Sequence, residues 1–394
     1  ANLTNLPASG GAITATASGA IASGKGVVLN ANGTVSEPTV TAGSWSHSLG
    51  TAYVAHSQAI CACGEGQFVA TYRNQSTGYH QIQAAQVAND GTTTWGTAVT
   101  IYSASCYQFD IDWDPVNNIG LVGTRRVTVN NRAHFNAFTI SGTTVTVNST
   151  AFTPSYISWA AIGDIVITYG VNDGGTSGFL LALTWGNTTQ MMFWYSLSMS
   201  GTPVSHNSTY LAFGNLSQQG YLTMAYDPDT TQWCACNQSS SSTSYNVSNL
   251  FKVNASGSVS KGSQVQFTTQ AINYIHRIAY DKTANKFVLI YNESTGNAGK
   301  VRIGSVSGTT ISWGSEATFS SGPIQYFDLD YSPDEGKAVL IWNNFTVPGY
   351  TLTDTRTTTI SISGTTPTAA TSTQVANISS WSPLYNIAFD PVSR

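Results

Sequence analysis

A glycine-containing turn that recurs about every fifty residues is the feature that most constrains how this chain can fold. Glycine suits such a turn because it adopts a positive φ angle at little cost. The glycines of six such turns lie 51, 59, 56, 51 and 56 residues apart. The turns are Asn89-Asp90-Gly91-Thr92, Ser141-Gly142-Thr143, Ser200-Gly201-Thr202, Ala255-Ser256-Gly257-Ser258, Ser307-Gly308-Thr309 and Ser363-Gly364-Thr365. A chain with this period is expected to fold as a series of equivalent modules.

An aromatic residue followed by a polar turn marks a second fixed point in the repeats. The examples are Trp113-Asp114-Pro115, Tyr226-Asp227-Pro228, Tyr280-Asp281-Lys282, Tyr331-Ser332-Pro333 and Phe389-Asp390-Pro391. The cleanest repeat, residues 275–319, contains four runs of β-branched and aromatic residues separated by polar turns. Four strands in each repeat of about fifty residues are typical of a β-propeller, in which every repeat forms one blade. We therefore predict an all-β fold and a β-propeller.

The two ends of the chain are predicted to share the closing blade. Residues 384–394 repeat only the first strand of a blade and its turn, and a lone strand with unpaired edges is not stable. Its expected partner is the segment of residues 24–56, which has strands but no good copy of the innermost strand. This arrangement gives seven four-stranded blades, and six blades with an appended terminal strand is the alternative. Residues 1–35 are predicted to be an attachment arm or part of the closing blade, and residues 36–394 the propeller.

Charged residues are unusually scarce in this sequence. Asp, Glu, Lys and Arg make up 9% of it, whereas an average domain contains about 25%. The net charge of −4 provides no basic surface for nucleic acid and no polybasic membrane anchor. No apolar run reaches the roughly 18 residues of a transmembrane helix. The N-terminus lacks the basic and apolar regions of a signal peptide, so we expect a cytoplasmic product or a mature end after cleavage.

The cysteines have two interpretations. The five residues are Cys61, Cys63, Cys106, Cys234 and Cys236, and an odd number argues against a complete disulfide framework. The two C-x-C pairs could supply a four-thiolate metal site, although zinc sites usually take their thiolates from turns with wider spacing. The favoured interpretation is that these cysteines are small apolar residues packed between blades.

Three aspartates, Asp110, Asp112 and Asp114, alternate along one strand, and Asp328 and Asp330 repeat the pattern in a later blade. The functional interpretation is a cation site or an acid/base pair near the axial channel. The structural interpretation makes Asp114 the cap of its turn and leaves Asp110 and Asp112 solvated in the channel. The strand pattern lacks the glycine bend of a calcium loop. We predict no metal and no cofactor, with Asp110, Asp112 and Asp330 as the weak metal candidates.

No catalytic motif stands out in the sequence. Neither H-E-x-x-H nor G-x-S-x-G is present, and no two histidines have zinc-ligand spacing. Propeller sialidases carry an Asp-box pattern, S-x-D-x-G-x-T-W, but residues 89–95 have the wrong spacing between Asp and Gly. We therefore predict a protein that is not an enzyme, and a glycan-cleaving propeller is an alternative.

An aromatic segment is the first candidate for a ligand-binding surface. Residues 184–199 contain Trp185, Trp194 and Tyr195 among methionines and other aromatic residues. Aromatic faces stack on sugar rings and anchor interfaces. The alternative is that about half of these side chains face the core of the protein because they alternate along a buried strand.

A basic cluster is the second candidate. It consists of Arg125, Arg126, Arg132 and His134, which are expected on a hairpin loop. These side chains would suit an acidic glycan, and the alternative is a loop whose charges are solvated.

The style of the repeats resembles that of one group of viral proteins. The pattern of residues 17–35 leads into blades that end in sequences such as S-G-T-T-I-S-W-G-S-E-A-T-F. Together they resemble propeller-type tail-fibre or other virion-surface proteins of tailed bacteriophages. The resemblance covers most of the chain but carries no catalytic motif, so it implies no functional residues. It implies a virion structural protein on a tail fibre, tail tip or capsid, where several copies assemble.

The leading hypothesis is therefore a non-enzymatic adhesion protein on a virion surface. The propeller would present its loops to a host-surface glycan or receptor, and residues 1–35 would attach it to other virion proteins. The first alternative is a secreted or cell-surface carbohydrate-binding propeller lectin. The second alternative is the glycan-cleaving enzyme.

Overall fold

The computed structural model describes residues 28–29, 35–36, 58–74, 76–88, 91–126, 132–152, 162–185, 189–197, 203–206, 211–215, 222–238, 246–332, 336–346, 351–376 and 386–389. The chain divides into two compact units, residues 1–46 with 87–93, and residues 47–86 with 94–394. In the first unit, β1 (Val28–Leu29) pairs antiparallel with β2 (Val35–Ser36). The predictions for residues 1–35, and for ring closure by residues 24–56, fall almost wholly outside the described residues and stay predictions.

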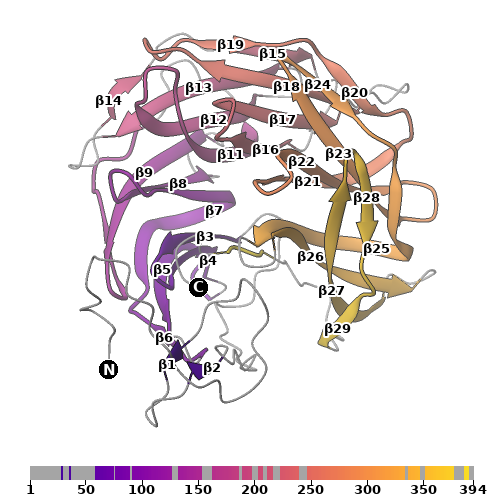
Figure 1. The fold of residues 1–394 in the computed structure, drawn as a ribbon. Helices are drawn as coiled ribbons and strands as arrows, with labels where there is room; N and C mark the ends of the chain where they lie inside the picture. The colour runs from indigo at the N-terminus through magenta and orange to yellow at the C-terminus, as the bar shows by residue number, and fades with distance from the viewer. Residues whose placement is uncertain are drawn as a thin grey trace. The chain divides into compact units, whose positions relative to one another are not determined.

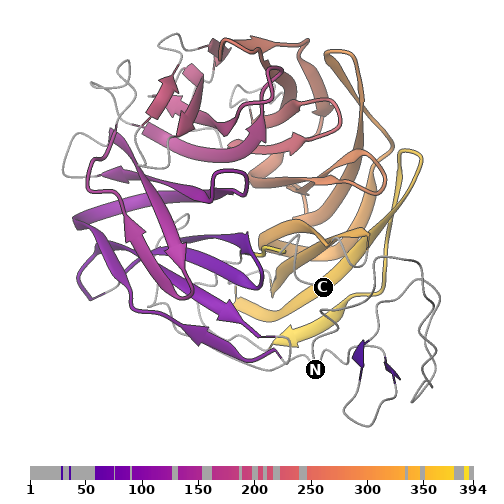
Figure 2. The same cartoon turned by 60° about the vertical axis from the view of Figure 1, so that its left-hand side comes forward.

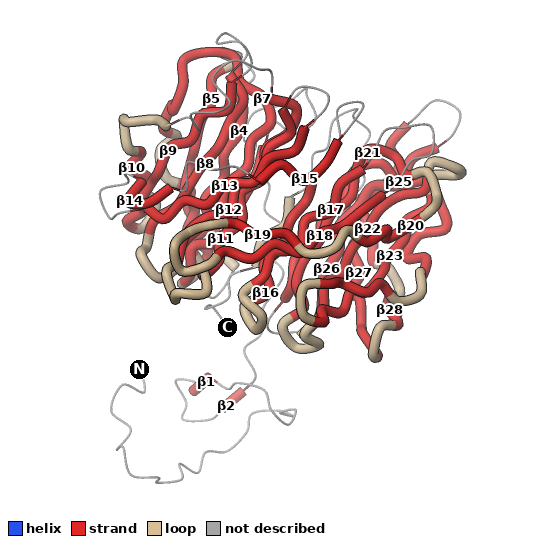
Figure 3. Tube along the Cα trace, turned by 90° about the horizontal axis from the view of Figure 1, so that it is seen from above, coloured by secondary structure: helices blue, strands red, loops and turns tan. Residues whose placement is uncertain are grey.

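The described part of the larger unit consists of strands and turns, and Figure 3 shows no helix in it. The strands form six successive antiparallel modules, which are numbered here in chain order. Module 1 contains β3 (Gln58–Gly64), β4 (Gln67–Arg73), β5 (Tyr79–Val87), β6 (Thr93–Trp95) and the first half of β7 (Val99–Asp114). Module 2 contains the rest of β7, β8 (Ile119–Arg126), β9 (Arg132–Ser141) and β10 (Thr144–Val147).

Modules 3 to 6 repeat this meander. Module 3 contains β11 (Ile162–Val171), β12 (Ser177–Trp185), β13 (Thr189–Leu197), β14 (Pro203–His206) and β15 (Leu211–Asn215). Module 4 contains β16 (Leu222–Asp227), β17 (Gln232–Gln238), β18 (Asn246–Val253), β19 (Val259–Lys261) and β20 (Val265–Thr268). Module 5 contains β21 (Ile272–Asp281), β22 (Lys286–Glu293), β23 (Ala298–Ser307), β24 (Thr310–Trp313) and the first half of β25 (Ala317–Ser332). Module 6 contains the rest of β25, β26 (Lys337–Thr346), β27 (Thr351–Ser363), β28 (Thr366–Ala369) and β29 (Thr373–Ala376).

The modules are the blades of a β-propeller, so the predicted fold class is confirmed. The first strand of each module lies innermost, and these strands neighbour one another in the order β3, β7, β11, β16, β21 and β25. Figures 1 and 2 show the sheets fanning out around this common centre. β7 and β25 link two modules each, because their first halves pair outward with β5 and β23 and their second halves pair with β8 and β26. No helix in the described part of the chain is long and apolar enough to cross a membrane.

The polar turns after the inner strands are held by aspartate side chains, as the sequence predicts. Asp114 accepts hydrogen bonds from the backbone N–H groups of Val116 (2.9 Å) and Asn117 (3.1 Å). Asp227 and Asp281 cap the equivalent turns of modules 4 and 5 in the same way. A short side chain that accepts N–H bonds two and three residues ahead fixes a tight turn. These turns set the register of each innermost hairpin.

The hydrophobic core is divided into layers between neighbouring modules. Five clusters of buried residues each take their side chains from two adjacent modules. Between modules 3 and 4, for example, the rings of Trp194 and Trp233 pack edge-to-face with their centroids 5.5 Å apart. Both rings are fully buried. A module therefore buries its faces only when its neighbours are in place, as expected for repeats that cannot fold alone.

At the outer edge of the ring, which we call the rim, the recurring glycine turn of one module contacts the module that precedes it in the chain. A Cβ atom at Gly96 of module 1 would lie 1.8 Å from the carbonyl oxygen of Thr143, in the Ser-Gly-Thr turn of module 2. Gly262 meets Thr309 at 1.8 Å and Gly314 meets Thr365 at 2.2 Å in the same way. Because real Cβ atoms never approach an oxygen so closely, only glycine permits this rim contact.

Candidate functional site

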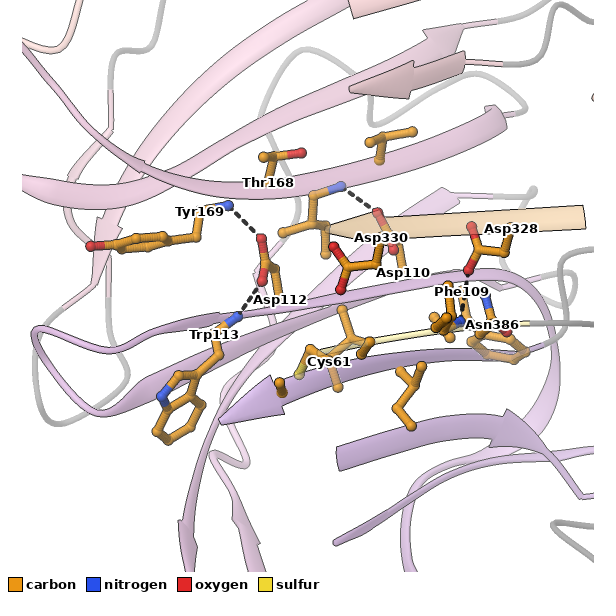
Figure 4. A pocket seen from close by; sticks show the side chains of 18 of the residues that line it. Cys61, Phe109, Asp110, Asp112, Trp113, Thr168, Tyr169, Asp328, Asp330 and Asn386 are labelled. Carbon is orange, nitrogen blue, oxygen red and sulfur yellow. Dashed lines mark hydrogen bonds between the residues drawn. The ribbon is translucent and has the colours of Figure 1, made fainter. Parts of the chain in front are cut away.

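The centre of the ring, which we call the hub, contains a cavity of about 790 Å³. It is lined by the six innermost strands and by residues 386–389 near the C-terminus. Figure 4 shows carboxylates, aromatic rings and the thiol of Cys61 on its wall. Ligand pockets usually measure about 300–1,000 Å³ and combine apolar surface with a few polar groups. The hub cavity is therefore the first candidate functional site.

Asp110 and Asp112 tie module 2 to module 3. Oδ2 of Asp110 accepts a hydrogen bond from the N–H of Ile167, and Oδ2 of Asp112 accepts one from the N–H of Tyr169, both at 2.6 Å (Figure 4). The donors lie two residues apart on β11, as the acceptors do on β7. The unpaired edge of an innermost strand presents N–H groups without a strand partner. The aspartates supply the missing acceptors.

The same arrangement recurs at two other places on the hub. Oδ2 of Asp164 accepts the N–H of Leu222 at 3.0 Å, which joins modules 3 and 4. Asp328 and Asp330 accept the N–H groups of Ile387 (2.9 Å) and Phe389 (2.8 Å). The C-terminal segment therefore bonds to β25 as β11 bonds to β7. We name these five carboxylates the hub aspartates.

The hub aspartates correct part of the sequence interpretation. Asp114 caps its turn as predicted. Asp110 and Asp112 line the cavity and are partly exposed, but they also accept backbone N–H bonds from the next module, which the sequence interpretation did not include. Oδ1 of Asp112 also accepts the N–H of Trp113 at 2.8 Å, and Oδ1 of Asp330 accepts that of Tyr331 at 2.7 Å. The physical reason is that the unpaired edge of an innermost strand needs acceptors for its N–H groups. Among the described residues, no group of three or more His, Cys, Asp or Glu side chains is arranged to hold a metal ion.

The hub raises the pKa of its carboxyl groups. Burial raises the pKa of Asp110 to about 8 and that of Asp330 to about 7, against the opposing effect of their backbone N–H bonds. Burial likewise raises the pKa values of Asp112 and Asp164 to about 6. The pKa of Asp328 is also raised by burial, although Arg277 opposes the shift. Carboxyl groups that titrate near neutral pH in a cavity are candidates for acid/base chemistry.

Arg277 is the positively charged group on the cavity wall. Its Nε lies 3.2 Å from Oδ1 of Asp328, and its Nη1 donates to the carbonyl of His276 at 3.0 Å. The side chains of Arg277 and Asp328 are 26% and 12% exposed. The side chain of Asn386 hydrogen-bonds to Asp328 as well. The pair thus presents a donor and an acceptor side by side at the cavity.

The predicted basic cluster comes together at the hairpin between β8 and β9. Arg126 faces Arg132 in the register, and His134 lies on the same face two residues along β9, whereas Arg125 points to the other face of the sheet. Sequence reasoning missed three partners. The guanidinium of Arg126 lies 4.5 Å from the ring centroid of Tyr102, and those of Arg73 and Arg125 lie 4.7 Å and 5.8 Å from that of Tyr107.

The predicted aromatic patch is not a surface. Trp194 is 1% exposed and Tyr195 is 4% exposed, and both belong to the layers that bury β13 between its neighbours. Along residues 191–197, where the side chains are described, both faces of this strand are covered and every side chain is buried. The side chain of Trp185 lies outside the described residues, although its backbone ends β12.

The cysteines follow the packing interpretation. All five are free, with Cys61 in the layer between modules 1 and 2 and Cys234 and Cys236 in the layer between modules 4 and 5. The two C-x-C pairs therefore do not share a site. Burial raises the pKa of the Cys61 and Cys236 thiols well above the usual range. Neutral buried thiols behave as small apolar side chains.

One sequence signal could have identified the missed residues. With only 9% charged residues, a charge placed within a strand is itself unusual. Asp164 stands near the start of β11, Arg277 stands in the middle of β21, and Arg73 ends the second strand of module 1. Only the structure shows which of these side chains contact one another across the ring.

The comparisons with known proteins concern the fold. No family model matches the chain, and no curated protein matches it in sequence. Among solved structures, it is similar to AofleA from Arthrobotrys oligospora, with 6% identity, a TM-score of 0.49 and coverage of 83% of this chain and 91% of that chain. It is similar to Aleuria aurantia lectin, a six-bladed β-propeller fungal lectin that recognises fucose, with 11% identity, a TM-score of 0.48 and coverage of 83% and 99%. A putative 6-phosphogluconolactonase from Bacteroides uniformis gives 12% identity, a TM-score of 0.48 and coverage of 80% and 87%. At TM-scores below 0.5 these likenesses carry no argument about what this chain binds.

Proposed function

We propose that this chain is a carbohydrate-binding β-propeller without enzymatic activity, and that it binds a saccharide at the hub. The observation that carries the proposal is the pairing of Arg277 with Asp328 on the wall of a cavity of about 790 Å³. A sugar hydroxyl both donates and accepts hydrogen bonds. A guanidinium and a carboxylate held side by side can therefore bind two adjacent hydroxyl groups.

The rest of the cavity wall suits the apolar face of a sugar. The partly exposed aromatic residues Tyr169 and Tyr326 line it. Aromatic rings supply rigid contact area to the C–H groups of a sugar ring. Asn386 adds an amide, which can both donate and accept. Polar groups that fix orientation on an otherwise apolar wall are typical of small-ligand sites.

Binding rather than cleavage is supported by the hydrogen bonds of the hub aspartates. A glycosidase needs two carboxyl groups that can reach the scissile bond as acid and as base or nucleophile. Each hub aspartate instead accepts a backbone N–H from a neighbouring strand. Moving one toward a substrate would leave a shielded N–H without an acceptor.

We further propose that the ring contains seven blades. β25 and β3 do not pack together as the other successive innermost strands do. Residues 386–389 bond to Asp328 and Asp330 on β25, and the same residues line the cavity together with β3. These contacts support a seventh innermost strand between modules 6 and 1. The N-terminal segment would supply the outer strands of that blade.

A glycan-cleaving enzyme is the second candidate, and the raised pKa values favour it. Burial gives Asp110 a pKa of about 8 and Asp330 a pKa of about 7, so both carry protons near neutral pH. A protonated carboxyl group in a cavity can serve as a general acid. This candidate predicts that the reducing ends of a bound glycan increase with time, and that Asp330→Asn stops the increase.

The setting of the protein is a separate proposal. The repeat style supports display on a virion surface, with attachment through residues 1–35 and several copies on each particle. A secreted or cell-surface lectin is the alternative setting. Mass spectrometry of purified particles against culture supernatant would separate the two, because only a virion protein remains with the particles.

The saccharide proposal is tested by a glycan array followed by titration of the best ligand. We expect Arg277→Gln to weaken binding by about tenfold or more, since a charge-assisted hydrogen bond contributes about 1.5–3 kcal/mol. Lys282→Gln is the matched control, because Lys282 is exposed on the turn of the same module. Thermal unfolding of both variants confirms that they fold. If no glycan binds, or if Arg277→Gln binds like the control, the proposal is wrong.

A further inference from the structure

We infer that Arg73, Arg126, Tyr102 and Tyr107 form an anion subsite that binds the carboxylate or sulfate group of an acidic saccharide. This inference rests on the proposed saccharide binding and names the class of saccharide. Arg73 ends β4 in module 1 and Arg126 ends β8 in module 2. Both tyrosines lie on β7, the strand that connects these two modules.

The two guanidinium groups keep unused hydrogen-bond donors. Within the described residues, the side chains of Arg73 and Arg126 form no ion pair and no hydrogen bond, and the Nε atom of each is shielded from solvent without a partner. A shielded charged donor without an acceptor costs free energy. The tyrosine rings under the guanidinium groups, at 4.7 Å and 4.5 Å, offset only part of this through cation–π contact. An oxyanion would supply the missing acceptors.

Arg73, Arg126, Arg132 and His134 determine the electrostatic potential at this surface. Cys106 faces Arg126 in the register of β7 and β8. Burial raises the pKa of Cys106, and the positive charges of Arg126 and Arg73 both oppose that shift, so both guanidinium groups act on this thiol. Burial, together with the positive charges of Arg126 and Arg132, lowers the pKa of His134 to about 4. The imidazole is therefore neutral at physiological pH and adds a polar group rather than a charge. The positive potential at this surface comes from arginines.

A β-bulge turns Tyr107 out of the core. Tyr107 and Phe109 pair with the consecutive residues Arg125 and Thr124, so Gln108 is the extra residue of β7. Gln108 has φ = +52°, a left-handed conformation that a non-glycine residue adopts at a cost. The bulge makes Tyr107 and Phe109 point to opposite faces. Phe109 is buried, whereas Tyr107 is partly exposed and meets Arg73 and Arg125.

The geometry fits a planar or tetrahedral oxyanion. Arg73, Arg126, Tyr102 and Tyr107 are each partly exposed, so a ligand reaches them without opening a packed layer. Guanidinium groups bind carboxylates and sulfates with two parallel N–H bonds, which lysine cannot reproduce. The tyrosine rings fix the planes of the guanidinium groups in advance, which reduces the side-chain entropy lost on binding.

The inference is tested with pairs of glycans that differ only in an acidic group. The probes are sialyllactose against lactose, galacturonic acid trimer against galactose trimer, and sulfated lactose against lactose. We expect the wild-type protein to bind the acidic member of at least one pair about tenfold or more tightly. This preference should shrink between about 0.1 M and about 1 M NaCl, where the Debye length falls from about 10 Å to about 3 Å.

Two double variants and a control assign the preference to these residues. Arg73→Gln with Arg126→Gln should remove the preference, so that the acidic member binds no more tightly than the neutral member. Arg73→Lys with Arg126→Lys should keep only part of it, because the charge remains and the planar fork is lost. Lys261→Gln with Lys282→Gln removes the same charge from exposed positions in modules 4 and 5 and should behave like wild type.

The outcomes separate this inference from the proposed function. If a neutral saccharide binds in an Arg277-dependent way but no acidic partner binds more tightly, the anion subsite alone is wrong. The same holds if an acidic preference survives both Arg73 and Arg126 substitutions. If no saccharide of any pair binds, both the subsite and the proposed function fail.

Discussion

The modules are joined in two different ways, at the hub and at the rim. Aspartates on the hub join module 2 to 3, module 3 to 4 and module 6 to the C-terminal segment through hydrogen bonds of 2.6–3.0 Å. At the rim, a glycine packed against a threonine carbonyl joins module 1 to 2, module 4 to 5 and module 5 to 6. Among the described residues, the backbone N–H bonds of the hub aspartates and the rim contacts occur at different module boundaries, whereas the ion pair of Asp328 with Arg277 lies at the boundary between modules 5 and 6 beside a rim contact. The ring therefore combines electrostatic contacts and steric fit in different proportions at its boundaries.

The boundary between modules 4 and 5 shows what replaces the aspartates. Ala225 of module 4 occupies the position that Asp112 and Asp330 hold in the aligned repeats. It is buried in the apolar layer between modules 4 and 5. The ring nitrogen Nε2 of His276 lies 2.9 Å from the carbonyl oxygen of Cys236 and provides a polar link there. The hydroxyl of Tyr280 donates to Asp229 at 2.9 Å, and Gln232 donates to the carbonyl of Gly308 at 2.9 Å. This boundary therefore combines apolar contact, the rim and side-chain hydrogen bonds, and it lacks the bonds from hub aspartates to backbone N–H groups.

The largest expected effect comes from removing the aspartates between modules 2 and 3. Asp110→Ala with Asp112→Ala leaves the N–H groups of Ile167 and Tyr169 without acceptors. Each shielded, unsatisfied donor costs about 1–3 kcal/mol, so the free energy of unfolding should fall by about 2–6 kcal/mol. Urea unfolding followed by tryptophan fluorescence measures the loss.

Two further variants test whether the lost stability comes from the missing acceptors. Asp110→Asn with Asp112→Asn keeps an acceptor oxygen at each position and should lose clearly less stability than the alanine pair. Asp173→Ala breaks an exposed ion pair with Lys252, which is worth about 0–1 kcal/mol, and an exposed hydrogen bond from Thr231. If the alanine pair is no less stable than Asp173→Ala, the aspartates do not hold this boundary.

A smaller loss is expected at the rim. Gly262→Ala would place its Cβ 1.8 Å from the carbonyl oxygen of Thr309, so modules 4 and 5 must shift apart. Overpacking of this kind usually costs about 1–3 kcal/mol. Gly322→Ala is the matched control, because the nearest atom to its Cβ would be the side-chain oxygen of Ser320 at 4.0 Å. Equal unfolding midpoints for the two variants would show that the rim contact contributes nothing.

The repeat period predicts more of this molecule than any single motif does. The spacing of the glycine turns gives the modules, and the Asp turns give the innermost hairpins, because both depend on local backbone geometry that few residues satisfy. The rim contact could also be anticipated in part. Gly96 and Gly314 each follow a tryptophan, in Trp95-Gly96 and Trp313-Gly314. A glycine at the same place in two repeats indicates a close approach.

The sites were harder to predict because they depend on which modules become neighbours. The arginines of β8 were visible in the sequence, but Arg73 joins them from another module across β7. The aromatic segment was misjudged for a related reason. Trp194 and Tyr195 face two different layers, and a strand covered on both sides has no exposed face. Composition alone does not distinguish such a strand from a surface patch.

The smallest effect, and the sharpest distinction between hub and rim, is a dependence of stability on pH. Burial raises the folded-state pKa of Asp110 to about 8 and that of Asp330 to about 7, whereas an unfolded aspartate titrates near about 3.9. The folded protein therefore binds more protons than the unfolded chain at neutral pH. Stability from these groups is complete below the unfolded pKa and is lost as pH rises through about 7 to 8. Buried histidines act in the opposite direction at lower pH, because burial lowers the pKa of His276 to about 4.

The useful window is therefore about pH 7 to about pH 8, where an unfolded histidine with a pKa of about 6.5 has already lost most of its protons. We expect the urea midpoint of the wild-type protein to fall across this window, and Asp110→Asn with Asp330→Asn to flatten the change, because amides do not titrate. Gly262→Ala should lower the midpoint at both pH values and keep the wild-type difference, since a steric contact carries no proton. If the amide variant shows the same pH dependence as wild type, the carboxyl groups at the hub are not its source. If Gly262→Ala changes the dependence instead, the distinction between an electrostatic hub and a steric rim is wrong.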